Sequence, residues 1–147
     1  MKFQEYLQKS IDIANEEKAI LDELSKKDKL NKIEIRAAKS SLQVLIENSI
    51  GKAKRILKYY NCPIVPTRSK DAILFLYEIG LIDEEMYKSL IKAIGFRNSM
   101  IHDYMDFNVE ILSEIVKNRY YLDLYNFLVE IPNYNEVLIK RIENFNI

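Results

Sequence analysis

The chain has 147 residues, 48% of them apolar, with one cysteine, one histidine and a formal net charge of zero. This length suits one hydrophobic core, so we expect a single domain over residues 1–147. The lone Cys62 excludes an intramolecular disulfide and a multi-cysteine metal site. The N-terminus lacks the apolar stretch of a signal peptide, and the longest apolar run, residues 72–77, is too short to span a membrane. We therefore expect a cytoplasmic protein with no membrane partner.

The zero net charge hides an uneven distribution along the chain. Residues 26–70 contain 12 basic and 3 acidic side chains, a balance of +9, which leaves −9 for the remaining residues. Such a basic segment either contacts nucleic acid or covers the solvated face of a long helix, and the sequence leaves both interpretations open. Under the first interpretation, the candidate RNA-binding residues are Arg36, Lys39 and Arg55.

Apolar residues recur with helical spacing along the chain, beginning with a first predicted helix from Phe3 to about Leu24. Asn31, followed three residues later by Glu34, is the predicted N-cap of a long second helix that ends near Tyr60. The stripe predicted to be buried on this second helix comprises Leu42, Leu45, Ile46, Ser49, Ala53, Ile56, Leu57 and Tyr60.

The basic excess of the second helix lies off that stripe, on Arg36, Lys39, Lys52, Arg55 and Lys58. Gly51 falls in the interior of the same helix, which disfavours an unbroken helix there. After this helix, two prolines three residues apart, Pro63 and Pro66, predict a loop.

A third helix is predicted to start near Thr67 or Ser69 and to stop at Gly80. Asp83 is the predicted N-cap of a fourth helix, which continues toward the lone histidine. Asn108 is the predicted cap of a fifth helix that runs to about Val129 and is ended by Pro132, and a short amphipathic tail follows over residues 137–145.

Five helices with short connections predict an all-α fold, an antiparallel bundle. The apolar positions on the fifth helix and the tail exceed one narrow stripe. This excess indicates either a thicker core or a face covered by a second copy of the chain in a symmetric dimer.

The chemistry of the chain centres on His102 and Arg97. Arg97 occupies a place that the apolar pattern of the fourth helix reserves for buried residues, so it needs an anionic partner or an open cleft. His102 lies five residues on, about 140° round an ideal helix, so the two side chains converge only if the helix ends or distorts nearby. A permanent cation beside an imidazole that titrates near neutrality suits phosphodiester cleavage, in which RNA supplies its own 2′-hydroxyl nucleophile.

Other chemistries fit the sequence less well. A carboxylate-bridged dimetal site in a bundle needs histidines on two helices, and this chain has one histidine. We find no glycine-rich phosphate loop, no Gly-x-Ser-x-Gly elbow and no Cys–His arrangement suited to catalysis. We therefore expect neither a metal nor another cofactor.

The stretch Arg97-Asn98-x-x-x-His102-x-Tyr104, preceded by Gly95-Phe96, resembles the signature of the HEPN RNase toxins of the HepT/MntA toxin–antitoxin family. The segment from Arg36 to Gln43, and on through the Pro66 loop, is also similar to that family. The resemblance therefore covers most of the chain.

This resemblance implies a HEPN-like fold and a homodimer whose motifs face each other across a shared cleft. It implies metal-independent cleavage of RNA by Arg97, His102 and Asn98, leaving a 2′,3′-cyclic phosphate and a 5′-hydroxyl. It also implies an antitoxin partner, an MntA-like nucleotidyltransferase that silences the toxin by adenylylating Tyr104. A second interpretation stays open: a non-catalytic helical module that docks on a nucleotidyltransferase and uses Arg97 as an anion contact.

Overall fold

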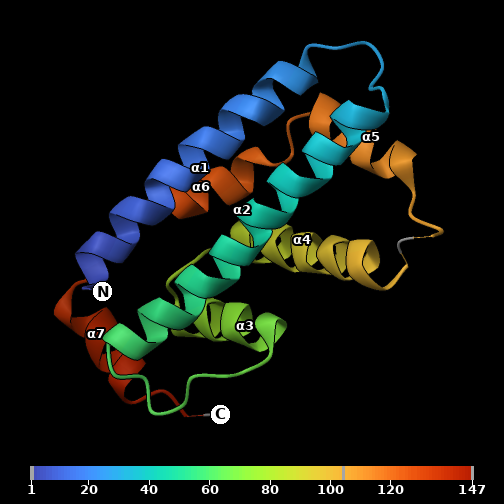
Figure 1. Ribbon diagram of the computed structural model, residues 1–147. Helices are drawn as coiled ribbons and strands as arrows, with labels where there is room; N and C mark the ends of the chain where they lie inside the picture. The colour runs from blue at the N-terminus through green and yellow to red at the C-terminus, as the bar shows by residue number, and fades with distance from the viewer. Residues whose placement is uncertain (1, 104, 147) are drawn as a thin grey trace.

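A computed structural model describes residues 2–103 and 105–146, and all regular structure in these residues is helical, which confirms the all-α prediction. The first two helices, α1 (Phe3–Ser25) and α2 (Lys32–Tyr59), run in opposite directions along the length of the molecule (Figure 1). They contact each other more extensively than any other described pair of helices. This antiparallel pair is the scaffold on which the remaining helices pack.

Two local features shape α2: a capping box at its start and a glycine in its middle. The predicted capping box is present: the Asn31 side chain accepts a 2.9 Å hydrogen bond from the Glu34 amide, and the Glu34 carboxylate accepts one of 2.9 Å from the Asn31 amide. Gly51 does not break the helix, which runs unbroken to Tyr59 and confirms the prediction of one long helix. A Cβ at Gly51 would lie 3.2 Å from the Tyr6 hydroxyl, so the glycine allows α1 to approach α2 closely.

Two shorter helices, α3 (Ser69–Ile79) and α4 (Glu84–His102), lie against α2 and against each other. The predicted stop at Gly80 is confirmed, since this glycine has a left-handed backbone with φ 98°. Asp83 caps α4 as predicted, accepting a 2.8 Å hydrogen bond from the Met86 amide. The end of α3 at Gly80 and the cap at Asp83 fix where α4 begins. They therefore also set the position of the motif at the C-terminal end of α4.

The prediction of one continuous fifth helix is wrong. The chain forms α5 (Val109–Lys117) and α6 (Leu122–Val129), with Arg119 between them in the left-handed region at φ 55°. The amides of Arg119 and Tyr120 turn back to carbonyls of α5 and close its last turn. Glycine usually occupies a left-handed backbone position of this kind. Because the residue here is an arginine, the sequence did not indicate that the helix breaks.

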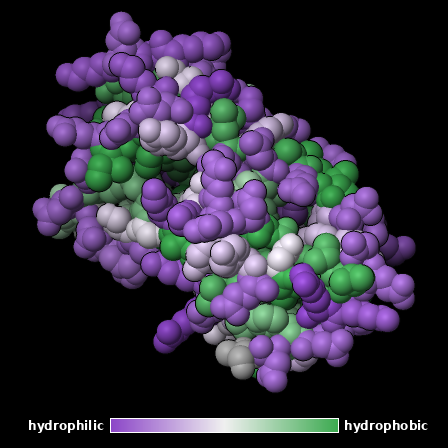
Figure 2. Space-filling model, turned by 180° about the vertical axis from the view of Figure 1, so that it is seen from behind, coloured by the Kyte–Doolittle hydropathy of each residue, from purple (hydrophilic) through white to green (hydrophobic). Residues whose placement is uncertain are grey.

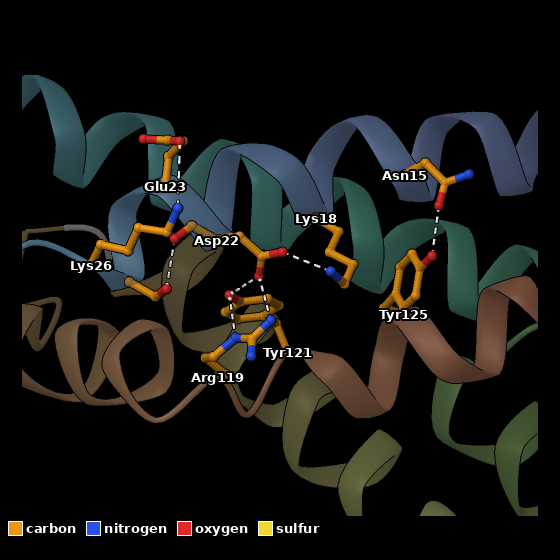
Figure 3. Close-up of polar contacts among 9 residues, drawn as sticks. Asn15, Lys18, Asp22, Glu23, Lys26, Arg119, Tyr121 and Tyr125 are labelled. Carbon is orange, nitrogen blue, oxygen red and sulfur yellow. Dashed lines mark hydrogen bonds and ion pairs between the residues drawn. The ribbon is translucent and has the colours of Figure 1, made fainter.

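The break between α5 and α6 inserts Tyr121 into the core, where it is fully buried. Its hydroxyl donates a 2.6 Å hydrogen bond to Asp22 of α1, and the same carboxylate oxygen accepts from Arg119 at 3.0 Å (Figure 3). Lys18, one turn earlier in α1, contacts the other carboxylate oxygen at 2.6 Å. Partial burial works to raise the pKa of Asp22, but the hydrogen bonds from Lys18, Tyr121 and Arg119 outweigh it and lower that pKa to about 2.

The predicted tail forms a further helix, α7 (Glu136–Glu143), capped by Asn135. It packs beside α3, where the rings of Phe75 and Phe145 lie 4.8 Å apart between centres (Figure 1). In the part of the chain that the structure describes, no helix is long and apolar enough to cross a membrane.

The core consists of aliphatic and aromatic side chains contributed by every helix. The stripe predicted for α2 is buried throughout except for Tyr60, which is partly exposed. The predicted apolar positions of α1 are also all buried: Phe3, Leu7, Ala14, Leu21 and Leu24.

Lys52 corrects the predicted solvent-facing set of basic residues. Its side chain is 1% exposed, and its ammonium group donates to the carbonyls of Phe127, Leu128 and Glu130 at the end of α6. Burial lowers the pKa of Lys52 to about 8, partly opposed by the charge of Glu130. Lys52 therefore ties α2 to α6 and is unavailable to an RNA ligand.

Candidate active site

Arg97, Asn98 and His102 of the sequence motif lie on the last two turns of α4. The helix ends at His102, and the Asp103 amide closes it by donating to the Ser99 carbonyl at 2.9 Å. Phe107 then returns toward the helix and packs edge-on against Phe96, with 5.4 Å between ring centres.

Arg97 points toward the neighbouring helices. Its side chain is 17% exposed, and one terminal nitrogen lies 3.3 Å from a carboxylate oxygen of Glu47 on α2. The other terminal nitrogen donates a 3.0 Å hydrogen bond to the hydroxyl of Ser69, the first residue of α3. The anionic partner that the sequence required of Arg97 is therefore Glu47.

Among the described residues, the buried Nε–H of Arg97 has no hydrogen-bond acceptor. A buried donor without a partner costs about 1–3 kcal/mol. Arg97 is thus held by residues of α2 and α3, while its buried Nε–H has no acceptor among the described residues.

His102 and Asn98 are placed differently from Arg97. His102 is exposed at the end of α4, and no hydrogen bond joins its side chain to another described residue. Asn98 is partly buried beside Arg97. The structure does not join Arg97 to His102 within one chain, as their separation of about 140° around the helix requires. Tyr104, the predicted adenylylation site, lies outside the described residues.

The three candidate RNA-binding residues of α2 are not gathered at one point. Arg36 is exposed and lies on nearly the same side of α2 as Glu47, about 16 Å along the helix axis. The Lys39 ammonium lies 4.3 Å from the centre of the Phe107 ring, close to the return from α4. Arg55 stacks on Tyr6 of α1 at 4.5 Å, about 28 Å from Arg36 along the axis. Of the three, only Lys39 is therefore placed beside the segment that follows the motif; Arg36 and Arg55 lie about 16 Å and about 12 Å from Glu47 along the axis, in opposite directions.

A cavity of about 530 Å³ opens between α2, α4, α5 and α6. Figure 2 shows a hollow among apolar side chains on the corresponding face. Arg97 and His102 are not among the described residues that line this cavity; the apolar ones are Leu42, Ile46, Ala93, Phe96, Ile111, Ile115 and Leu124. This cavity therefore borders the motif at Phe96 but is separate from Arg97 and His102.

Sequence reasoning missed Glu47 and Ser69, which hold Arg97. Glu47 is the one acidic residue of α2 beyond its first turn, and an isolated acid within a basic helix was the available signal. Ser69 gave no such signal. As for metals, no three His, Cys, Asp or Glu side chains gather into a possible site within residues 2–103 and 105–146.

Comparison with known proteins identifies a protein family and a curated relative that this chain matches. A family model described as Ribonuclease HepT-like matches residues 3–131. The mRNA nuclease HepT of Shewanella oneidensis is 32% identical over 55 residues, which span 37% of this chain and 41% of that nuclease. This chain therefore aligns with about two fifths of the length of the curated relative.

Two solved structures share the fold. One is a crystal structure of a toxin–antitoxin with AMP-PNP, and the other is a tri-AMPylated Shewanella oneidensis HEPN toxin in complex with an MNT antitoxin. Each has a TM-score of 0.74 and 21% identity over 87% of this chain, covering 97% and 96% of the respective structures. With the family match over residues 3–131, these findings confirm the resemblance first indicated by the motif. The chain belongs to the Ribonuclease HepT-like family.

Proposed function

We propose that this protein is the toxin of a toxin–antitoxin pair and that it cleaves RNA without a metal ion. The observation that carries the proposal is the placement of Arg97 and His102 on the last two turns of α4 in a HepT-like chain. The name of the Shewanella oneidensis relative, an mRNA nuclease, supports the same substrate class.

The proposed reaction uses the RNA as its own nucleophile. The 2′-oxygen forms a bond to the adjacent phosphorus while the bond from phosphorus to the 5′-oxygen breaks, leaving a 2′,3′-cyclic phosphate and a 5′-hydroxyl. His102 transfers protons as general acid or base, a role that contributes about 10²–10⁴-fold. Arg97 neutralises the charge that builds up on the phosphate, and Asn98 orients either the phosphate or His102.

We further propose that two copies of the chain form the active site. The reaction removes one proton and supplies another, and each chain brings one histidine. Large apolar side chains are exposed around the motif: Ile101, Met105, Val109 and Ile111 are 38–83% exposed. A symmetric dimer that covers these residues would bring a second His102 close to the first. Light scattering should give a mass of two chains.

A cleavage assay tests the enzymatic part. Purified protein is incubated with single-stranded RNA in excess EDTA, and the rate of strand scission is measured for the wild type and for His102→Ala. We expect cleavage by the wild type and none by the variant, while Lys88→Ala, on the exposed first half of α4, behaves as wild type. Loss of cleavage in EDTA, or full activity of His102→Ala, would contradict the proposal.

We propose Tyr104 as the site of silencing by a partner nucleotidyltransferase. The Shewanella oneidensis toxin that shares this fold is tri-AMPylated and bound to an MNT antitoxin, which supports this form of regulation for the present chain. An adenylate near Arg97 adds negative charge and bulk where an RNA phosphate would bind. Incubation with the partner and ATP should add one or more AMP masses to the wild type and to Tyr120→Phe, an exposed control tyrosine. Modification that persists in Tyr104→Phe would contradict the assignment.

The second candidate function is a non-catalytic module that docks on a nucleotidyltransferase. It is favoured by the pairing of Arg97 with Glu47 and by the lack of a hydrogen bond between Arg97 and His102 among the described residues. Expression in cells separates the two functions. A toxin should arrest growth, and His102→Ala should relieve the arrest; a docking module should not arrest growth.

A further inference from the structure

The ion pair between Arg97 and Glu47 raises a question that the proposed reaction leaves open. Arg97 is assigned to an RNA phosphate, yet one of its terminal nitrogens already lies 3.3 Å from a carboxylate. At this distance the negative charge of Glu47 offsets much of the positive charge that an approaching anion would experience. In the resting protein, Arg97 is therefore a weak anion site.

The two partners of Arg97 differ in how easily they can be displaced. Ser69 is partly buried at the start of α3 and is neutral, so its hydrogen bond does not compete with a phosphate for charge. The Glu47 side chain is 46% exposed, whereas that of Arg97 is 17% exposed. The arginine is thus fixed in the structure, and its acidic partner is the member that borders solvent.

Glu47 also has space to move. It borders an open hollow of about 280 Å³ on the surface of α2, together with Ser40, Gln43, Val44 and Asn48. An ion pair with one half-exposed partner contributes little to stability, so little is lost when Glu47 moves away from Arg97. A phosphate, which can accept two parallel hydrogen bonds from a guanidinium, is a stronger partner for arginine than a single carboxylate oxygen.

We propose that Glu47 masks Arg97 in the resting protein and is displaced when an RNA phosphate binds, so that Glu47 sets how tightly the site holds RNA. This inference rests on the proposed function. Glu47 acts through Arg97 and is a positioning residue, not a catalytic one. Its removal should therefore strengthen the binding of RNA, in contrast to removal of Arg97.

The test measures affinity for a fully 2′-O-methylated single-stranded RNA, which lacks the 2′-hydroxyl and cannot be cut. Glu47→Gln keeps the size of the side chain and removes its charge. We expect this variant to bind the oligonucleotide about twofold to fivefold more tightly than the wild type at low salt. The slope of log affinity against log salt should change by less than the value of about 0.7 for a full single-strand phosphate contact, because Arg97 contacts the phosphate in both proteins once RNA is bound.

Two controls separate masking from a general change in charge. Glu16→Gln removes the same charge from an exposed position in the middle of α1 and should leave the affinity close to that of the wild type. In an Arg97→Gln background, Glu47→Gln should lose its effect. Unchanged or weaker binding by Glu47→Gln would overturn the proposal, and so would an equal gain in the Arg97→Gln background. Failure of every variant to bind would also overturn it, because unmasked Arg97 should hold a phosphate.

Cleavage of unmodified RNA in EDTA by the same proteins keeps this inference distinct from the proposed function. We expect Glu47→Gln to lower KM more than it changes kcat, since it removes competition for substrate. If the wild type does not cleave RNA, the proposed function fails, while the affinities still decide whether Glu47 masks Arg97.

Discussion

Within the described residues, two arginine–carboxylate pairs join segments far apart in sequence, and they are built in opposite ways. In the pair of Arg119 and Asp22, the carboxylate is the more enclosed member, with 26% of its side chain exposed, and it also receives Lys18 and Tyr121 (Figure 3). In the pair of Arg97 and Glu47, the arginine is the enclosed member, and its carboxylate partner is half-exposed.

The difference separates a structural cluster from a candidate site. Asp22 receives hydrogen bonds from three side chains, and this excess of donors favours one arrangement of α1 against the break between α5 and α6. Arg97 has one exposed acidic partner and one buried N–H with no acceptor among the described residues. An enclosed cation with a displaceable partner can accept an anion from outside, whereas an enclosed anion with three donors cannot.

The largest expected effect of breaking either pair is on catalysis. Arg97→Ala should lower kcat/KM for RNA cleavage by about 10²–10³-fold, because the charge on the transition-state phosphate would be left without its partner. Arg119→Ala should leave cleavage close to that of the wild type. Initial rates of the three proteins on one RNA substrate make the comparison. Equal losses in both variants would mean that the two pairs do not differ in function.

The next effect is on stability. Asp22→Ala should lower the free energy of unfolding by about 2 kcal/mol, because it removes a charged acceptor shared by three donors. Urea denaturation followed by circular dichroism measures the change. Asp12→Ala, on the same helix but exposed, is the matched control and should change stability by less than about 0.5 kcal/mol. If the two variants are equally stable, the Asp22 cluster does not hold the fold together.

The smallest effect is a pH dependence specific to Asp22. Its pKa in the folded protein is about 2, below the ordinary value of 3.8, so folding favours the carboxylate. The resulting stabilisation is fully present above about pH 4 and is lost as the pH falls from about 4 toward 2. The wild type should therefore lose stability over this range more steeply than Asp22→Asn. Identical slopes for the two proteins would contradict the lowered pKa.

Much of the fold could be predicted because its signals are local. Asn31, Asp83 and Asn108 each act as the N-cap that its residue type indicates, and Gly80 ends α3. The break at Arg119 could not be predicted, because arginine rarely adopts a left-handed backbone and what stabilises the turn is the distant contact of Tyr121 with Asp22.

The candidate site likewise has a part that could be predicted from the sequence and a part that could not. The sequence indicated that Arg97 occupies a buried position and needs either an anionic partner or an open cleft, because both follow from helical periodicity and the cost of burying a charge. It could not identify Glu47 or Ser69, since these contacts depend on how α2, α3 and α4 pack. Lys52 was misassigned for the same reason: its carbonyl partners lie at the end of α6, more than 70 residues away in sequence.

The measurement that tests the central claim most directly is the chemistry of the ends left on cleaved RNA. RNA is treated with wild-type protein and with His102→Ala in EDTA, and the fragments are examined for their terminal groups. We predict 2′,3′-cyclic phosphates and 5′-hydroxyls from the wild type and no new ends from the variant. Fragments with 3′-hydroxyls and 5′-phosphates, or the same cyclic ends from His102→Ala, would contradict the assignment of His102 and Arg97 to RNA cleavage.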